Sequence, residues 1–481
     1  MFKLAPLSAA IVLGLVGQAM ADDSTSTQSQ FGTENIGEVK QLAAPLSTTT
    51  QTQFGLGNNS AALQDSSSAD IQQLHQGQYN AGYAEQLFEG ASTISQQAAG
   101  SFNNTHASQS LGQSNQATQV QEGSGNFSFI YQDSQVGSQG TTLQYGDSNE
   151  ANVEQLFGGA GNNALIIQSG SGNFSAAEHQ GHNDGQIGIY QGGEGNWAYG
   201  DQTAGIGGTL SITQSGAYNS SEVWQDTQLG SQAMVQQYGQ TNEGIIDQSF
   251  GESNLATIIQ AGDLNAIYAD QYESLNSVTS LYQTGTGNVH FTYQSGDSHV
   301  LTASSSGTGN KVLASNWKGD KAGGQFGTGQ RAEVHQVGAG NSANLTQDGI
   351  AQLARLNQNG ARNTAELTQI DSNNELYFEQ NGSDNLLIAD QRGTDNYATG
   401  SSNGTANSIQ LEQSGSGNQS YTWQLYGDNN SASIKQTDGV NVAYVTQGGS
   451  GNQAMVDQSG ANMSATIQQF GAANQATVLQ Q

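Results

Sequence analysis

The sequence lacks cysteine altogether and contains very little proline or charge. Of its 481 residues none is Cys, 2 are Pro and 10% are charged. Disulfides are therefore excluded, so backbone pairing and side-chain hydrogen bonds must hold the fold together. Only 34% of the residues are apolar, whereas an ordinary globular domain has roughly 45–50% apolar and about 25% charged residues. This composition disfavours both a packed globular enzyme and a highly charged disordered tail.

Basic residues are scarce. Ten Lys and Arg accompany 40 Asp and Glu, which gives a formal net charge of −30. Nucleic acids and anionic membrane surfaces are recognised by clustered Lys and Arg, so we expect neither as a partner. Between Asp22 and Asn310 the only base is Lys40, while eight bases lie between Lys311 and Lys435. The acids are expected to keep the chain soluble.

The first residues have the features of a secretory signal peptide. In residues 1–21 a basic start is followed by an apolar run at 4–16, and Ala19 and Ala21 form a small-residue cleavage site. This run is too short to span a bilayer. No later stretch approaches the about 18 consecutive apolar residues of a membrane helix. We therefore expect a mature chain that begins near Asp22 and is exported without membrane insertion.

The abundant residues, 64 Gly and 63 Gln, recur in one frame, Q-x-G-x-x-N-x-A-x-x-x-Q. Internal repetition of this kind indicates a solenoid or an array. The frame is complete in six segments, whose opening Gln, Asn and closing Gln are Gln144, Asn149 and Gln155; Gln191, Asn196 and Gln202; Gln336, Asn341 and Gln347; Gln358, Asn363 and Gln369; Gln447, Asn452 and Gln458; and Gln469, Asn474 and Gln480.

The closing Gln can be followed from unit to unit as a mark. The marks run from Gln30 to Gln480, number 41, and define 40 units that are mostly eleven or twelve positions long. Four marks are not Gln, namely His75, Ser305, Asn316 and Ser402. At His75 the imidazole is expected to replace the amide as a hydrogen-bond donor and acceptor.

Each unit has the periodicity of a β-strand. Asn149, Ala151, Val153 and Gln155 alternate with other residues, and a period of two places them on one face of a strand. A helix is disfavoured because a Gly recurs about every eleven residues. Four residues with a Gly in second position join one Gln to the next Asn, and such a segment makes a reversing turn. The turn glycines of the six segments are Gly146, Gly193, Gly338, Gly360, Gly449 and Gly471.

These units predict an all-β fold, a β-solenoid in which two strands and two turns close one coil. Forty units make about 20 coils, and a strand spacing of about 4.8 Å gives a rod roughly 95 Å long. Stacking places every Gln and Asn over another of its kind, so that their amides form hydrogen-bonded ladders along the rod. Such ladders satisfy inward polar groups whose burial would otherwise be unfavourable.

With the signal peptide, the frame resembles the curlin repeat of bacterial curli fibre subunits over the whole segment from Gln30 to Gln480. The resemblance implies a secreted subunit of an extracellular cross-β amyloid fibre at the bacterial cell surface, which serves adhesion and the biofilm matrix. It also implies a homopolymer, export through a dedicated outer-membrane pore, and growth from a minor nucleator subunit.

The chain departs from the curlin pattern in two ways. Curli subunits have far fewer coils, and a Gly- and Asn-rich export segment precedes their first repeat. Here residues 22–52, with a degenerate first unit, take the place of that segment. Complete units up to the last residues favour the major fibre subunit over a nucleator.

The marks divide the rest of the chain into a repeat block at 53–305, an irregular basic joint at 306–324 and a second repeat block at 325–481. Steps of eleven and twelve positions alternate in most of the first block, and steps of eleven dominate the second. We therefore expect one turn of each coil in the first block to be one residue longer.

Around the joint, Ser305 at the end of the first block and Asn316 within the joint replace ladder Gln, and the step after Asn316 is only nine residues. The segment Trp317–Gly324 includes Lys318 and Lys321. One interpretation is a decayed repeat; the other is a hinge or a control point for export or nucleation. Either way, we expect missing ladder bonds to make this the weakest place in the rod.

The sequence contains no catalytic, metal or cofactor motif, and no enzymatic activity is expected. His179, His182 and Asp184 lie close in sequence, but His179 is next to the presumed ladder residue Gln180, and no further ligand has a fixed spacing. Ser, Asp and His are present without a nucleophile elbow. Acids such as Asp247, Asp270 and Asp457 occupy one outward strand position, where they would limit lateral sheet packing.

Three functions compete. The first is a self-assembling fibre subunit, whose uncovered first and last coils would stack without limit. The second is a monomeric β-solenoid adhesin or ice-binding rod, for which we expect end caps and a flat face of Thr-x-Thr ranks, and neither is evident. The third is a polysaccharide hydrolase, for which the turns of four or five residues are too short. The fibre subunit is the preferred interpretation.

Overall fold

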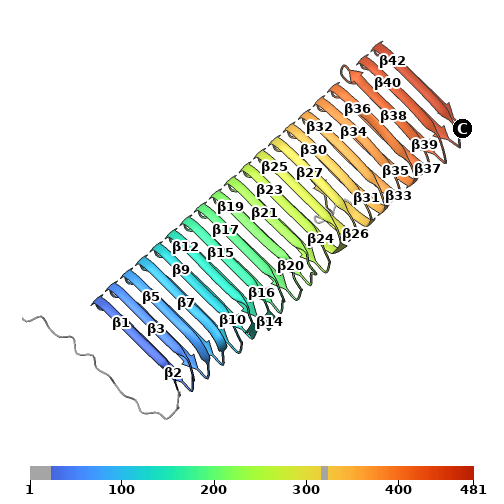
Figure 1. Cartoon of the computed structure of the whole chain (residues 1–481). Helices are drawn as coiled ribbons and strands as arrows, with labels where there is room; N and C mark the ends of the chain where they lie inside the picture. Colours follow the sequence, from blue (N-terminus) through green and yellow to red (C-terminus); the bar gives the residue numbers. More distant parts are fainter. Residues whose placement is uncertain (1–22, 316–322) are drawn as a thin grey trace, which may run out of the picture.

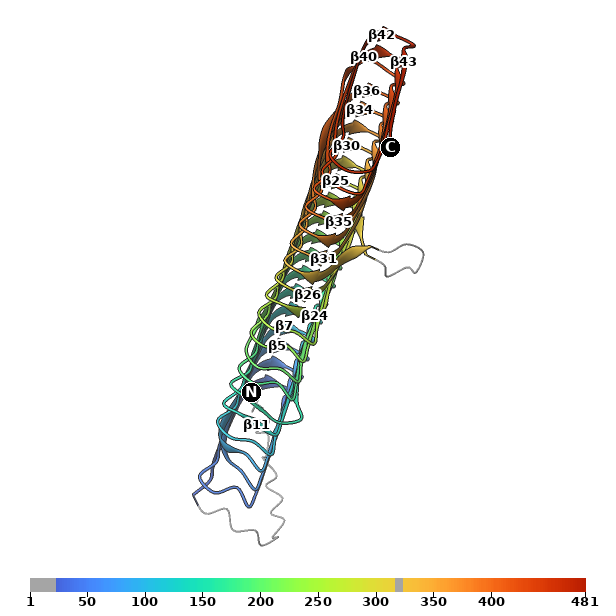
Figure 2. The ribbon, with the colours of Figure 1, turned by 90° about the vertical axis from the view of Figure 1, so that its right-hand side faces the viewer.

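The structure, a computed structural model, describes residues 23–315 and 323–481, which form one long rod of stacked β-strand coils (Figure 1). Two parallel sheets run along the rod on opposite sides, as the view turned by 90° shows (Figure 2). The first sheet has 20 strands. The predicted all-β solenoid of about 20 two-strand coils is confirmed. In the part of the chain that is described, no helix is long and apolar enough to cross a membrane.

The strands of the first sheet are β1 (Thr25–Thr33), β3 (Thr48–Leu56), β5 (Ser68–Gln78), β7 (Gly90–Ser101), β9 (Gln116–Ser124), β12 (Gln139–Asp147), β15 (Asn163–Ser171), β17 (Gln186–Glu194), β19 (Thr209–Ala217), β21 (Gln232–Gln240), β23 (Leu255–Asp263), β25 (Val278–Thr286), β27 (Val300–Thr308), β30 (Arg331–Ala339), β32 (Leu353–Ala361), β34 (Glu375–Ser383), β36 (Tyr397–Thr405), β38 (Gln419–Tyr426), β40 (Val442–Ser450) and β42 (Ser464–Ala472).

The strands of the second sheet are β2 (Ile36–Leu42), β4 (Asn59–Asp65), β6 (Ala81–Leu87), β8 (Asn104–Ser110), β10 (Phe127–Asp133), β13 (Glu150–Leu156), β16 (Phe174–Gln180), β18 (Trp197–Thr203), β20 (Ser220–Asp226), β22 (Glu243–Ser249), β24 (Ala266–Leu275), β26 (Val289–Asp297), β28 (Lys311–Ala314), β29 (Gly324–Thr328), β31 (Ser342–Ile350), β33 (Thr364–Ser372), β35 (Leu386–Thr394), β37 (Ser408–Ser416), β39 (Ser431–Thr437), β41 (Gln453–Ser459) and β43 (Gln475–Gln480). A two-residue pair, β11 (Gln135–Val136) and β14 (Gly159–Ala160), lies at a turn.

Each strand pairs in parallel with the equivalent strand of the next coil. In the first block Gln144 lies opposite Gln168, whereas in the second block Gln336 lies opposite Gln358. Comparison of the two spacings shows that this coil of the first block is two residues longer. The longer coils of the first block owe their extra residues mainly to the turn that leads from the second sheet back to the first.

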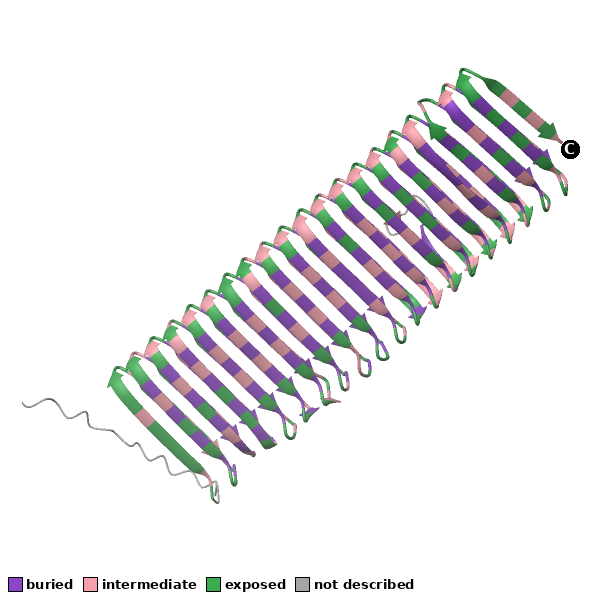
Figure 3. Cartoon of the chain, turned by 45° about the horizontal axis from the view of Figure 1, so that its top comes forward, coloured by how far each residue is buried: buried purple, intermediate pink, exposed green. Residues whose placement is uncertain are grey.

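Residues alternate along every strand between the interior and the surface, which Figure 3 shows as alternating colours. Asn149, Ala151, Val153 and Gln155 point inward and are at most 1% exposed. The inward Ala, Val, Ile and Leu form one continuous apolar core from Ala62 to Ile467. The core is narrow, so each coil buries only a few side chains and depends on the coils on either side.

Large and small inward residues compensate each other across the interior. A Cβ atom added to Gly82 would lie 2.5 Å from His75 Nε2 in the opposite sheet. A Cβ added to Gly200 would lie 2.8 Å from Leu210 Cδ2. The interior therefore keeps a nearly constant volume per coil, as close packing requires.

The irregular joint does not interrupt the stack. β28 and β29 together fill one position of the second sheet, since both pair with β26 on one side and with β31 on the other. Gln294 donates to Gln325, and Gln325 donates to Gln347. Counting a ladder mark at Asn316, followed by a nine-residue step, was therefore wrong, and the rod has 40 marks rather than 41.

Two predicted segments fall outside the described residues. They are the signal peptide with Ala19 and Ala21, and the centre of the joint with Asn316, Trp317, Lys318 and Lys321. Within residues 22–52, β1 pairs with β3 in full register from Thr25 to Thr33, so this segment has the geometry of a coil. A role of this segment in export stays a prediction.

The turn glycines stack so closely that no side chain fits. Gly146 has φ +114°, and a Cβ added to it would lie 2.1 Å from the carbonyl oxygen of Gly170 in the next coil. Such values of φ are open to Gly alone. The predicted turn glycines Gly146, Gly193, Gly338, Gly360, Gly449 and Gly471 all have φ between +98° and +124°.

Replacing one of these glycines should therefore open the rod locally. We expect Gly146→Ala to destabilise β9, β12 and β15 by about 3–4 kcal/mol, because the methyl group displaces the neighbouring coil. Gly172→Ala is the matched control, since Gly172 has φ +64° and free space around its Cβ position, so the loss should be about 1–2 kcal/mol. Hydrogen exchange of the backbone amides measures both. Equal protection in the two variants would contradict the packing argument.

Candidate functional site

The buried feature that repeats most often is a column of Gln side chains in each sheet. Gln144 Nε2 donates to Gln168 Oε1 at 2.9 Å and also to the backbone oxygen of Phe127. In the second sheet, Gln132 Nε2 donates to Gln155 Oε1 at 2.7 Å. In both columns the amide donates toward the C-terminal end of the rod. Each Gln thus satisfies two other buried groups, as buried polar atoms must.

A column of Asn side chains follows the turn after the first sheet and runs in the opposite direction. The backbone N–H of Asn149 and its Nδ2 both donate to Asn126 Oδ1, at 3.0 and 3.2 Å. Asn149 Nδ2 also donates to the carbonyl oxygen of Gly170 in the next coil, at 3.0 Å. Each Asn therefore ties three coils together at the turn, and the turn glycine supplies one of the acceptors.

The six predicted frames occupy equivalent places. In each frame the opening Gln lies in the first sheet, the Asn in the turn and the closing Gln in the second sheet. All 18 are buried except Asn474 and Gln480 in the last coil. Two pairs of frames are direct neighbours, with hydrogen bonds of 2.7 to 3.1 Å from Gln336 to Gln358, Gln347 to Gln369, Gln447 to Gln469, Gln458 to Gln480, Asn363 to Asn341 and Asn474 to Asn452. The frames beginning at Gln144 and Gln191 are separated by the coil of Gln168.

A further Gln column, which was not predicted from the sequence, lies in the first five coils. Its members lie two residues before the marks of the first sheet and donate to one another at 2.7 to 2.9 Å, namely Gln28, Gln51, Gln73, Gln96 and Gln119. The signal was a second Gln that recurs once per coil, as in the Q-x-Q pairs at Gln28, Gln51 and Gln119. This column makes the interior of the first coils more polar than that of the later ones.

The Gln column of the second sheet is interrupted at His179. The prediction that Gln180 is the ladder residue is wrong, since His179 pairs in register with Gln155 and Gln202 and is fully buried. Neither ring nitrogen of His179 has a hydrogen-bond partner, and Gln202 Oε1 lacks one as well. In the first sheet, Ala98 takes a Gln position and leaves Gln121 Oε1 without a partner. These coils lack amide bonds that the rest of the stack has.

His179 and His182 do not form a metal centre with Asp184. The two rings lie 6.0 Å apart, while Asp184 is exposed on the turn. Burial lowers the pKa of His179 to about 3 and that of His182 to about 4, so both rings stay neutral near pH 7. In residues 23–315 and 323–481 no group of three His, Asp or Glu side chains is placed to hold a metal ion.

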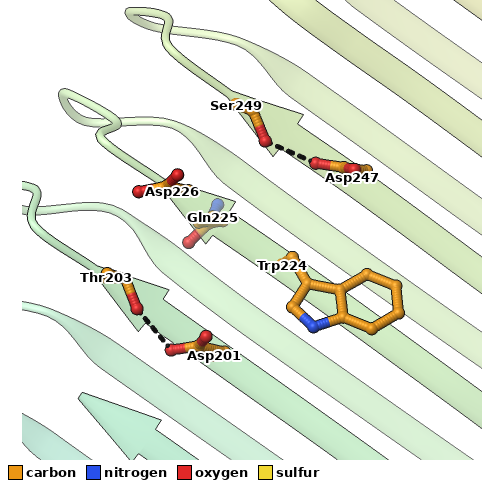
Figure 4. Close-up of a pocket in the computed structure, with 7 residues that line it drawn as sticks. All are labelled: Asp201, Thr203, Trp224, Gln225, Asp226, Asp247 and Ser249. Carbon is orange, nitrogen blue, oxygen red and sulfur yellow. Dashed lines mark hydrogen bonds between the residues drawn. The ribbon is translucent and has the colours of Figure 1, made fainter. Parts of the chain in front are cut away.

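The outward acids form a column on the second sheet. Figure 4 shows Asp201 and Asp247 on either side of Trp224, where Thr203 donates to Asp201 at 2.9 Å. These residues line a shallow hollow of about 330 Å³. Burial, and then neighbouring acids, raise the pKa of Asp201 to about 6 and that of Asp270 to about 7.

The bases of the second block lie among acids on the outer surface. Ion pairs of 2.7 to 3.0 Å join Arg331 and Arg355 to Glu333, Arg362 to Asp384, Arg392 to Asp390 and Lys435 to Glu412. Each of these five bases is therefore paired with an acid on the same surface. They therefore do not provide the unpaired basic patch that binding to nucleic acid requires.

Comparison with known families identifies the repeat. The model of the curlin associated repeat family matches residues 382–415 and 404–437. The two matches begin one coil apart, since Gly382 lies opposite Gly404 in the paired strands β34 and β36. They cover the strands from β35 to β39, so the resemblance to the curlin repeat is confirmed there. No curated protein sequence matches the chain.

Restoring the interrupted column should stabilise the rod. We expect His179→Gln to join Gln155 to Gln202 and to raise the free energy of opening of β13, β16 and β18 by about 1–3 kcal/mol. Since the folded-state pKa of His179 is lowered from 6.5 to about 3, the contribution of the neutral imidazole to stability is complete above pH 6.5 and is lost as the pH drops toward 3. The His179→Gln variant should therefore lose less stability than the wild type over this pH range.

Hydrogen exchange at several pH values measures the effect of His179→Gln. His335→Gln is the matched control, because His335 is exposed on the outer face of β30. A gain of the same size in the control would show that loss of an imidazole, rather than repair of the column, is responsible.

The acid column of the second sheet should make stability depend on pH in the sense opposite to that of His179. The pKa of Asp270 is raised in the folded state, so its contribution is present below its ordinary pKa and is lost as the pH rises from about 4 through 7. We expect Asp270→Asn to raise the thermal midpoint at pH 8 and to leave it nearly unchanged at pH 4. Circular dichroism measures the thermal midpoint at both pH values. Asp457→Asn, beside Lys435, is the control, and an equal gain there would contradict the assignment.

Proposed function

Because this chain carries the curlin associated repeat on a β-solenoid, we propose that it is a secreted structural subunit. In this proposal, copies join end to end into an extracellular curli-like amyloid fibre that serves surface adhesion and the biofilm matrix. The observation that carries the proposal is the pair of open, mutually complementary ends of the rod.

Both end coils present strand edges with no partner in the described residues. β1 pairs only with β3 and β2 only with β4. At the other end, β42 pairs only with β40 and β43 only with β41. A row of unpaired N–H and C=O groups is a template for pairing with another chain. All the strands are parallel, so the last coil of one molecule matches the first coil of the next without a change in strand direction.

The side-chain columns give these ends opposite polarity. Gln30 and Gln41 donate to the second coil, and their own Oε1 atoms face the open end. At the C-terminal end, Gln469 and Gln480 accept from the preceding coil and have a free amide hydrogen. The Asn column is reversed, so Asn474 offers Oδ1 as an acceptor. Head-to-tail stacking therefore continues all three columns with donors against acceptors, whereas stacking of like ends does not.

Charge also favours this junction. The last coil, residues 464–481, contains no charged side chain, so repulsion between chains is weakest where they would meet. Three inward rows change residue type at this junction, since Ala465 would lie over Ser26, Ile467 over Gln28 and Ala476 over Gly37. The ladder rows and one apolar row match, with Gln469 over Gln30, Val478 over Val39 and Gln480 over Gln41.

The partners of this proposal come from the curlin resemblance. They are other copies of the chain, an outer-membrane secretion pore and a minor nucleator subunit. No catalytic activity, cofactor or resident metal is part of the proposed role, and neither nucleic acid nor membrane insertion is. The complete repeats of the last coils support a major subunit rather than a nucleator.

Fibre growth tests the proposal directly. The purified mature chain should form fibres with reflections at about 4.7–4.8 Å along the axis and at about 10 Å across it. Its net charge of about −31 should slow growth at low salt, and screening should speed it. Replacing Gln469 and Gln480 with Lys should slow elongation at least tenfold, because unpaired charges would be buried at the junction.

Outward-facing Gln475→Lys is the control and should elongate nearly normally, since Gln475 is exposed. A mature chain that stays monomeric for days at high concentration and salt would contradict the fibre.

The alternative is a monomeric adhesin or surface-binding rod. One observation favours it, since the structure has a partial flat Thr face that was not evident in the sequence. Thr48, Thr50 and Thr52 point outward on β3 and lie over Thr25, Thr27 and Ser29 of β1. A soluble monomer that binds a solid surface through this face would support the alternative.

A further inference from the structure

The central part of the outer face of the first sheet is almost free of charge over the first thirteen coils. The acids of these strands other than Asp70 follow the ladder residue, toward the strand ends, namely Glu122, Asp147, Glu194 and Asp263. Each strand from β1 to β27 has three central outward residues, at one, three and five positions before the ladder residue. Of these 39 positions only Asp70 is charged. The others are mostly Thr, Ser, Gln and aliphatic residues. We call these 39 positions the neutral face.

The rest of the rod differs sharply. The equivalent positions of the second sheet, from β2 to β26, number 36 and contain ten acids and Lys40. In the second block the first sheet itself is charged, with Arg331, Glu333, Arg355 and Glu379 pointing outward. The neutral face is therefore confined to one side of one block, in a chain with a net charge of −30.

The neutral face is also flat enough to pack. Its residues stack in register from coil to coil, as Thr141 over Leu165 and Thr118 show. One of its large side chains, Tyr190, lies along the strand, since a Cβ added to Gly188 would be 3.2 Å from the ring. One shallow hollow of about 250 Å³ interrupts it beside Gln72.

Its area suits a stable interface. Thirteen coils at about 4.8 Å and five residues at about 3.3 Å span roughly 60 by 17 Å, which is about 1,000 Å². A typical specific interface buries about 800 Å² per partner. Because like charges that meet without partners are costly to desolvate, this is the broad face on which two copies of so acidic a chain could approach closely.

We propose that the neutral face is an interface with a second copy of this chain. Two rods pack first sheet against first sheet, about 10 Å apart, as stacked sheets do. The acidic second sheets then point outward on both sides, where they limit association to a pair. This contact uses a different surface from the end-to-end junction, so the fibre of the proposed function would consist of paired rods.

Matched pairs of substitutions test the contact. The variant Thr141→Glu with Thr209→Glu places two charges on the neutral face. The control Asn152→Glu with Ser220→Glu places the same charges at the equivalent positions of the second sheet, in the same coils. In fibres of the wild type and of the control, the mass per length should correspond to two chains for each rod length. In fibres of the neutral-face variant it should be half of that value. The elongation rates of all three should be similar.

Sedimentation equilibrium of the soluble chain before elongation separates this proposal from the fibre itself. Wild type and control should form dimers, and the neutral-face variant should be monomeric with an unchanged circular dichroism spectrum. Dimers of an unextended chain would support the contact even without fibres. Single rods in the wild type, or pairing that survives in the neutral-face variant, would overturn it, as would a wild-type monomer that binds a solid surface through this face.

Discussion

The structure depends on the requirement that buried amide groups be hydrogen-bonded. Every coil places Gln side chains, and an Asn at the turn, in an interior too narrow for water to solvate them. An amide satisfies its donors and acceptors there when an identical amide lies directly above and below it, as is the case for Gln358 between Gln336 and Gln380. A slip of one residue would turn each inward Gln to the surface. The columns therefore determine the register of both sheets along the rod.

The other interior features follow from that register. Stacking in register brings the turn glycines to within contact distance of one another, which leaves no room for a side chain at positions such as Gly146. It also fixes which residues face each other across the core, so that a large residue such as Leu210 lies against a Gly such as Gly200 of the opposite sheet. Where a smaller residue replaces Gln in a column, a residue of the opposite sheet occupies the space. His290 fills the space beside Ser305, and the imidazole and hydroxyl are 2.7 Å apart.

The choice of residues on the surface is less constrained than in the interior, and the outer surfaces of the two repeat blocks differ in charge. Outward residues need only tolerate water and the coil above and below, so charge can be concentrated on one sheet and kept from the other. The acids of the second sheet lie about one strand spacing apart, and burial, together with the neighbouring Asp247, raises the pKa of Asp270. In the second block acids and bases alternate on the outer surface. The proposed assembly uses the uncharged last coil and the neutral face.

Much of the fold was readable in the sequence because its repeat is strict. A Gly every eleven residues excludes helices, alternation from Asn149 to Gln155 identifies the inward side, and the frame predicts both the amide columns and the turn glycines. The sequence also indicates that the longer steps reflect one longer turn. These features depend on local periodicity, which needs no knowledge of the neighbouring coil.

Only the tertiary structure determined the features that depend on how one coil pairs with the next. Following Gln from unit to unit selected Gln180 as the inward residue. Adjacent residues point to opposite sides of a strand, and the register with Gln155 and Gln202 shows that His179 is the one that points inward. Counting along the chain could not show that Gln325 closes the coil across the joint, since hydrogen bonds to Gln294 and Gln347 set that position. The neutral face likewise appears only when alternate strands are gathered into one sheet, because its neighbouring rows lie a full coil apart in the chain.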